Sequence, residues 1–206
     1  MGKRMNGASA KSPAAKRAKL PSPSIAAVIF LGNPGAEYEH TRHNAGRLLA
    51  AAFSPAWRKK FKGLFSPVPL TLNGAGKTVY FLLPETYMNL SGESAAALLS
   101  FYSLKPENCL VVHDEIELPL GAVALKWSGG LGGHNGLRSL KNRLGTADFW
   151  RLRLGVGRPP HDDIAGWVLS PFTLAEQTTL QPALALAKDL LTRAVFGEAE
   201  ECKLSV

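Results

Sequence analysis

The stretch Ile25-Ala-Ala-Val-Ile-Phe-Leu31, followed directly by Gly32-Asn-Pro-Gly35, decides the fold class. Seven consecutive apolar residues, with Val and Ile among them, are typical of a strand that is buried on both faces, as in a parallel sheet. Glycine and proline then end the strand at a turn. The sequence therefore opens its folded part with a buried strand that runs into a polar loop.

Comparable apolar runs recur along the chain and alternate with helical patterns. Strands are predicted at 78–83, 109–112 and 121–127, and alternation with arginines predicts a half-exposed strand at 150–156. Apolar spacing and start signals predict helices at 45–53, 91–104, 135–144 and 174–196. Strands separated by helices predict a single-domain, three-layer α/β sandwich whose mixed, mostly parallel sheet is flanked by helices.

The first 24 residues differ in composition from the rest. They hold six of the 24 basic residues and none of the 16 acidic ones, so residues 25–206 carry only +2 of the net charge of +8. Because bulky apolar side chains are scarce, residues 1–24 are predicted to be a disordered basic tail before a catalytic domain at 25–206. Lys16-Arg-Ala-Lys19 resembles a nuclear-import signal, and organelle presequences are also basic and acid-free. We predict a cytoplasmic protein, with an organelle or the nucleus as the alternative.

Polar residues follow two predicted strands at their carboxyl ends, where ligands bind in open α/β sheets. Asn33 follows the first of them, and His113-Asp114-Glu115 follows another. Because side chains alternate on a strand, only one of His113 and Asp114 is expected to reach a shared site. His43 lies at a predicted helix start, and with Asp114 beside it would form a base that activates water. A surface or capping histidine is the alternative.

Other kinds of site find less support. The glycines at 129–136 precede a helix, where backbone N–H groups can approach an anion, but no P-loop or dinucleotide spacing occurs. His113, Asp114, His134 and the cluster His161-Asp162-Asp163 lack the spacing of a known zinc site. No apolar run approaches the roughly 18 residues of a membrane span. We therefore expect no metal, no cofactor and no membrane partner.

A series of ordered motifs carries the interpretation further: Leu31-Gly-Asn-Pro-Gly-Ala-Glu-Tyr38, Thr41-Arg-His-Asn-Ala-Gly46, Thr86-Tyr-Met-Asn-Leu-Ser-Gly92, Val112-His-Asp-Glu115 and Gly132-Gly-His-Asn-Gly-Leu-Arg138. Their order and spacing resemble the signatures of bacterial-type peptidyl-tRNA hydrolases. Arg151-Leu-Arg-Leu-Gly-Val-Gly-Arg-Pro159 matches a further signature of that family. The resemblance spans about residues 25–180.

The resemblance implies hydrolysis of the ester between tRNA and a peptide or N-blocked amino acid, which recycles tRNA from aborted translation. It implies that His43 is the general base, that Asp114 is its partner, and that Asn33 lies near the scissile ester and helps to reject free aminoacyl-tRNA. A direct attack by water on an ester needs no covalent nucleophile. A peptidyl-tRNA partner, a monomer and the absence of a cofactor follow from the same resemblance.

The resemblance also implies residues that bind the substrate. Asn89 and Asn135 are similar to the amides that grip the peptide backbone, and Tyr38 and Tyr87 to the residues that line the aminoacyl-ribose end. The basic positions for tRNA phosphates match Lys126 and Arg153, and Arg138 extends that patch. A solvated helix face is the alternative for Arg138.

Three departures from the family pattern leave alternatives open. Phe30 stands where the family usually has glycine, Ala124 occupies a position that is often basic, and the end of the chain around 198–203 lacks the usual closing segment. A catalytically inactive tRNA- or RNA-binding relative is the main alternative. A metal-dependent nuclease or esterase is a second one.

Overall fold

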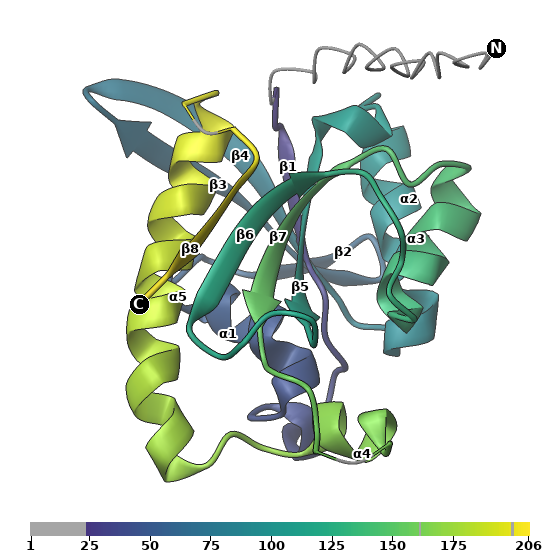
Figure 1. Cartoon of the computed structure of the whole chain (residues 1–206). Coiled ribbons are helices and arrows are strands. Elements are labelled where there is room, and N and C mark those ends of the chain that lie inside the picture. Colours follow the sequence, from purple (N-terminus) through teal and green to yellow (C-terminus); the bar gives the residue numbers. More distant parts are fainter. Residues whose placement is uncertain (1–23, 161, 199) are drawn as a thin grey trace, which may run out of the picture.

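The computed structural model describes residues 24–206 except 161 and 199, so all but the last residue of the predicted tail lies outside the described residues. A mixed sheet forms the middle layer, in the order β2-β3-β4-β1-β5-β7-β6-β8 (Figure 1). Its four central strands are parallel: β4 (Ala75–Pro84), β1 (Ala27–Phe30), β5 (Cys109–Glu115) and β7 (Trp150–Gly155). Antiparallel pairings add β2 (Arg58–Lys60), β3 (Gly63–Leu72), β6 (Ala122–Trp127) and β8 (Cys202–Ser205) at the two sides.

Helices cover both faces of this sheet (Figure 1). On one face lie α1 (Ala45–Ala51) and α5 (Leu174–Val195), and on the other lie α2 (Ser91–Phe101) and α3 (Asn135–Leu144). The short helix α4 (Ile164–Leu169) sits beyond the carboxyl ends of the parallel strands. Each face has its own hydrophobic cluster, so the predicted three-layer α/β sandwich is confirmed.

Strand β1 shows why the opening stretch is apolar throughout. Val28 and Phe30 belong to the cluster under α1 and α5, whereas Ala27 and Ile29 belong to the cluster under α2 and α3. Side chains alternate on a strand, so a strand covered on both faces has no polar position. The ring of Phe30 packs edge-on against Phe81 at 4.9 Å between centroids, within the α1/α5 core.

Strand β7 is buried rather than half-exposed, so that prediction was wrong. The Arg151 side chain is 3% exposed and donates to the carbonyl oxygens of Gly129 and Gly130 at 2.9 and 2.6 Å. Loop carbonyls replace the water that a guanidinium would otherwise need. The alternation of arginine with apolar residues on β7 therefore reflects a face that a loop covers, not a face exposed to solvent.

The hairpin β3–β4 was not predicted as a pair, although its turn carries a known signal. Asn73 and Gly74 join the two strands, and both have positive φ, as a two-residue type I′ turn requires. Pro67 and Pro69 lie within β3, and because prolines within a run argue against a strand, the sequence pattern did not predict β3. Within the described residues, no helix is long and apolar enough to cross a membrane.

Candidate active site

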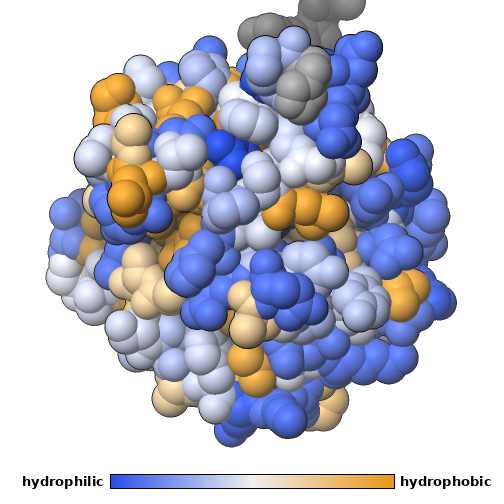
Figure 2. Space-filling view, turned by 90° about the horizontal axis from the view of Figure 1, so that it is seen from below, coloured by the Kyte–Doolittle hydropathy of each residue, from blue (hydrophilic) through white to orange (hydrophobic). Residues whose placement is uncertain are grey.

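A cavity of about 850 Å³ lies beyond the carboxyl ends of β1 and β5. Its polar lining includes Asn33, His43, Asn89, Asp114, His134 and Asn135. Figure 2 shows the molecule from this side, where hydrophobic residues form separate patches among hydrophilic ones. Tyr87, Ile164 and Leu169 contribute exposed apolar surface to the cavity, at 60, 39 and 44% exposure. The cavity thus combines a polar floor with an apolar wall, as ligand sites commonly do.

The backbone that carries His43 is fixed on both sides. His43 belongs to the 3₁₀ turn Arg42–Asn44, which leads directly into α1. A Cβ at Gly46 would lie 2.6 Å from the carbonyl oxygen of Leu31, so only glycine lets α1 approach β1 this closely. The buried Arg42 side chain donates two hydrogen bonds of 2.7 Å to Glu176 on α5. These contacts hold His43 against the strand ends.

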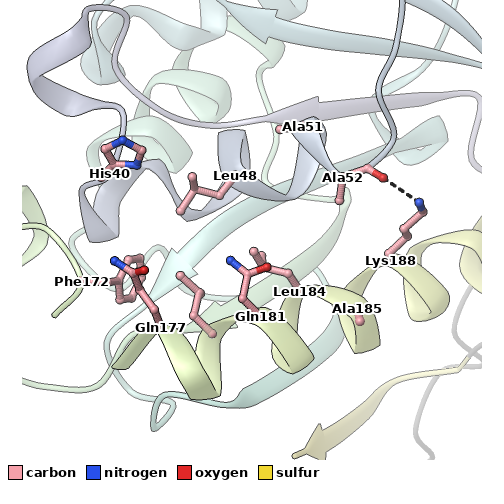
Figure 3. Close-up of a pocket in the computed structure, with 11 residues that line it drawn as sticks. His40, Leu48, Ala51, Ala52, Phe172, Gln177, Gln181, Leu184, Ala185 and Lys188 are labelled. Carbon is pink, nitrogen blue, oxygen red and sulfur yellow. Dashed lines mark hydrogen bonds between the residues drawn. The ribbon is translucent and has the colours of Figure 1, made fainter. Parts of the chain in front are cut away.

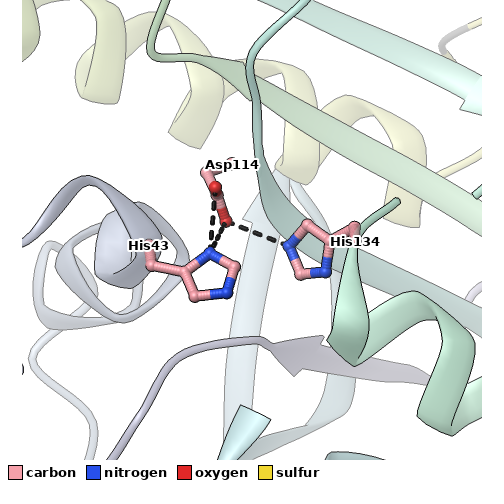
Figure 4. Close-up of side chains that lie close together, drawn as sticks. All are labelled: His43, Asp114 and His134. Atoms are coloured by element: carbon pink, nitrogen blue, oxygen red, sulfur yellow. Dashed lines mark hydrogen bonds and ion pairs between the residues drawn. The ribbon is translucent and has the colours of Figure 1, made fainter. Parts of the chain in front are cut away.

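Three side chains converge at the floor of the cavity (Figure 4). His43 Nδ1 lies 2.9 and 3.0 Å from the two carboxylate oxygens of Asp114. His134 Nε2 lies 3.0 Å from Asp114 Oδ1. Asp114 is 3% exposed and therefore bridges two histidines away from bulk water.

The hydrogen bonds of this trio assign its protons. His134 is the N-cap of α3, and its Nδ1 accepts from the backbone N–H groups of Gly136 and Leu137 at 3.1 and 3.4 Å. Nδ1 of His134 therefore carries no proton, and Nε2–H donates to Asp114. Nδ1–H of His43 also donates to this carboxylate, which leaves Nε2 of a neutral His43 ring with a free lone pair on the edge away from Asp114.

The charge of Asp114 is stabilised by the same contacts. Burial by itself would raise the pKa of the Asp114 carboxyl group, but His134 and His43 lower it below its usual range through charge and hydrogen bonding. Asp114 is therefore an ionised acceptor for both rings.

His113 also lines the cavity, so the expectation that only one of His113 and Asp114 would reach the site was wrong. The two side chains leave β5 on opposite faces, but the strand ends at the cavity, which is open to both. His113 Nδ1 donates to the carbonyl of Asp114 at 2.7 Å, and its ring packs edge-on against His134 at 5.0 Å. Burial lowers the pKa of His113, so this ring is neutral.

Asn33 is held by a residue that the sequence did not single out. Asn44 accepts from the Asn33 backbone N–H at 2.8 Å and donates to the Asn33 carbonyl at 3.0 Å. The side-chain oxygen of Asn33 accepts from the Met88 backbone N–H at 2.8 Å. Asn33 lines the cavity, and no described residue accepts a hydrogen bond from its Nδ2–H₂ group, so this group is available as a donor.

The sequence analysis considered His134 only as a metal ligand and did not name Asn44, so the roles of both residues in this site were missed. Both lie inside quoted motifs, and both have a signal in hindsight. His134 precedes a helix start and Asn44 precedes α1, so each was open to a simple capping interpretation. His134 caps α3 and also contacts Asp114, 20 residues away, whereas the Asn44 side chain makes no capping bond and instead contacts Asn33, 11 residues away.

The residues expected to bind substrate divide into two groups. Tyr87, Asn89, Asn135 and Arg138 line the cavity, and Arg138 donates to Asn135 Oδ1 at 3.2 Å. Tyr38 is half-buried in the 3₁₀ turn Ala36–Tyr38 and is not among the residues that line the cavity.

Lys126 and Arg153 lie outside the cavity, on neighbouring strands β6 and β7. Arg153 forms an ion pair of 2.8 Å with Glu115, which does line the cavity. The two basic residues are therefore beside the site rather than in it.

The trio is also the group of the described residues whose ligand atoms could share a metal ion, all within 4.8 Å of one another. Two histidines and a carboxylate are a ligand set that zinc and iron accept. However, the facing atoms are 2.9–3.0 Å apart and form hydrogen bonds, which a metal would have to displace. Of the cluster 161–163, residue 161 lies outside the described residues, and Asp163 caps α4 through the Gly166 N–H.

A second cavity of about 750 Å³ lies between α1 and α5 (Figure 3). Aliphatic residues such as Leu48 and Leu184 line it, with Gln177 and Gln181 beside them. Its amine, Lys188 Nζ, donates to the carbonyl of Ala52 at 2.6 Å. Nothing in this lining pairs an acid with a base, so the cavity at the strand ends is the candidate active site.

The sequence signature of peptidyl-tRNA hydrolases matches residues 27–204. The chain belongs to this family. The peptidyl-tRNA hydrolase of Treponema pallidum is 49% identical over 180 residues, which cover 84% of this chain and 89% of that protein. The enzyme of Neisseria meningitidis is 41% identical over 184 residues, with 87 and 95% coverage.

Solved structures of peptidyl-tRNA hydrolases share the fold. The crystal structure of the Acinetobacter baumannii protein superimposes with a TM-score of 0.76 at 35% identity, and covers 87% of this chain and 93% of that one. The relatives are hydrolases, and they give no support to the alternative of an inactive RNA-binding relative. The matched residues 27–204 include His43, Asp114 and His134 and the helices on both faces of the sheet.

Proposed function

We propose that this chain hydrolyses the ester bond of peptidyl-tRNA and so returns tRNA from aborted translation. The observation that carries the proposal is the buried His43–Asp114–His134 trio at the floor of the cavity. Family membership gives the reaction class, and the trio supplies a base for it.

In the proposed reaction, His43 Nε2 removes a proton from a water molecule as the water attacks the ester carbonyl. Asp114 keeps the proton on His43 Nδ1 and stabilises the imidazolium that forms. His134 supplies a second hydrogen bond to Asp114 and fixes its orientation. The ribose hydroxyl of the tRNA leaves with the proton that His43 has accepted.

Asn33 is proposed to donate from Nδ2 to the ester carbonyl oxygen as negative charge develops there. The hydrogen bond from Met88 N–H to Asn33 Oδ1 and the contacts of Asn44 hold this donor before the substrate arrives. A preorganised donor is worth most in the transition state, because it needs no reorganisation at the moment of reaction.

Asn89 and Asn135 are proposed to bind the peptide backbone, and Tyr87 to contact the aminoacyl-ribose end. Tyr38, which lies next to the Asn33 loop, is proposed to support that end from outside the cavity. A neutral amide can donate to and accept from an acylated nitrogen, whereas a free ammonium group offers no acceptor and carries charge. Selectivity for N-blocked substrates follows.

We further propose that Lys126, Arg153 and Arg138 contact tRNA phosphates, and that the enzyme acts as a monomer without a cofactor in the cytoplasm. Both cysteines are free, as expected in a reducing compartment. An organelle or the nucleus is the alternative if residues 1–24 are a targeting signal.

The test is release of N-acetyl-aminoacyl groups from tRNA by the full chain, with free aminoacyl-tRNA as the substrate control. His43→Ala should abolish release and keep tRNA binding, whereas His40→Ala, at an exposed histidine of the second cavity, should behave like the unmodified protein. Bound tRNA without turnover would reject the hydrolase in favour of an RNA-binding protein. Loss of activity after dialysis against a chelator would reject the mechanism without metal.

A further inference from the structure

The face of the sheet that is turned away from α5 carries a row of basic side chains. On β6 and β7, Val123 and Leu154 belong to the core beneath α5. Since side chains alternate, their neighbours in sequence point to the opposite face. The basic residues among these neighbours are Lys126, Arg151 and Arg153.

The last strand adds a fourth basic residue to this face. Cys202 on β8 packs against the α5 core, so Lys203 points the other way. The register pairs Lys203 with Ala124, and Ala124 in turn with Arg153. Residues opposite each other on adjacent strands share a face, so this row crosses the three strands.

Two of the four cations already have protein partners. Arg151 donates to backbone carbonyls of the loop at Gly129 and Gly130, and Arg153 pairs with Glu115. Lys126 and Lys203 are exposed, and no ion pair to either is formed by the residues that the structure describes. Strand spacing puts their Cα atoms roughly 8 Å apart.

The row is continuous with the active site. Arg153 is paired in register with His113 on β5, and its partner Glu115 lines the cavity. A substrate whose ester lies at His43 would extend its neighbouring nucleotides over this face. Lysine suits backbone phosphates there, since a flexible stem with a point charge needs no fixed geometry.

We propose that Lys203, supplied by the terminal strand β8, also binds a phosphate of the tRNA backbone, and that it extends the position already assigned to Lys126 into a phosphate-binding strip. This inference rests on the proposed function. Each contact of this kind releases about one counterion, so removing it reduces the salt dependence of binding by about one unit of slope.

The test measures binding of labelled deacylated tRNA to the full chain over a series of KCl concentrations. Lys203→Ala is expected to raise Kd about fivefold at 0.1 M salt and to reduce the slope of log K against log salt by about one. Lys126→Ala should behave similarly, and Lys203→Arg should restore both values. Lys105→Ala removes the same charge at an exposed site before the amino end of β5, and should change neither.

Steady-state kinetics distinguish a variant that binds tRNA less tightly from one that is misfolded. Lys203→Ala should raise KM for N-acetyl-aminoacyl-tRNA while kcat stays within twofold. An unchanged slope in Lys203→Ala, beside a reduced slope in Lys126→Ala, would overturn the role of Lys203 and leave the proposed function intact. If the unmodified chain neither binds nor cleaves the substrate, the proposed function fails, and the strip fails with it.

Discussion

The two cavities of the molecule have similar volumes, about 850 and 750 Å³, but differ in the elements that build them. One lies where parallel strands end and loops begin, and the other lies in a groove between α1 and α5. Backbone groups lose their sheet partners where strands end. The loops that follow bring polar side chains from different segments to one point, as Asn33, His43 and Asp114 show. A groove between helices that pack on a core receives mainly aliphatic side chains. The volume of a cavity therefore does not by itself show whether the cavity is an active site.

The largest effect should follow from breaking the trio. In Asp114→Asn an amide replaces the carboxylate that accepts from two histidines, so it would turn one N–H₂ group toward a ring N–H and favour the wrong tautomer of His43. We expect turnover to fall by about 10²- to 10⁴-fold, with little change in the far-ultraviolet circular dichroism spectrum. Single-turnover kinetics measure this effect, and normal kinetics would contradict the pairing.

A second effect concerns stability and arises from His113, which is 1% exposed. Burial lowers its pKa in the folded state, so below about pH 6.5 the unfolded chain binds a proton that the folded chain does not. The stability from this group is present above that pH and is lost as the pH falls, by up to about 1.4 kcal/mol per unit. We therefore expect the free energy of unfolding to fall as the pH is lowered from 6.5 to 5.

Urea unfolding at several pH values checks this expectation. His113→Gln should remove the slope, and His40→Gln should leave it in place because His40 is exposed. An equal slope in all three proteins would show that His113 is not the group that responds to pH.

A smaller effect is expected at His134, which both caps α3 and orients Asp114. Asparagine caps helices well but does not reach the carboxylate as a histidine ring does. His134→Asn should therefore lower kcat by roughly tenfold while the free energy of unfolding changes little. His134→Ala should lower kcat similarly and also lose about 1 kcal/mol of stability. Full activity in both variants would show that His43 alone orients Asp114.

The smallest effect is expected in the second cavity. Gln181 is exposed there, and Gln181→Leu should leave turnover within twofold and the free energy of unfolding within about 0.5 kcal/mol. A tenfold loss of activity in this variant would mean that the cavity between α1 and α5 is coupled to the active site. The functional difference between the two cavities would then be disproved.

By itself, the sequence determined the class of fold and the polar ends of its strands. The buried strand at 25–31, the helix before Gly145 and the long C-terminal helix follow from local patterns, because burial on two faces and helical periodicity leave direct marks on residue order. The motif series indicated His43, Asp114 and Asn33 by position.

Tertiary structure decided what those residues contact. His134 caps α3 and also contacts Asp114 on β5, and a capping residue looks the same in sequence whether or not its other ring nitrogen meets a carboxylate. Asn44 contacts the loop after β1, which becomes its neighbour only when α1 packs on that strand. Edge strand β8 was not predicted, because it is short and exposed and is defined by pairing with β6. Pairing between strands depends on long-range contacts, so the register that sets Lys203 beside Ala124 could be known only from the folded chain.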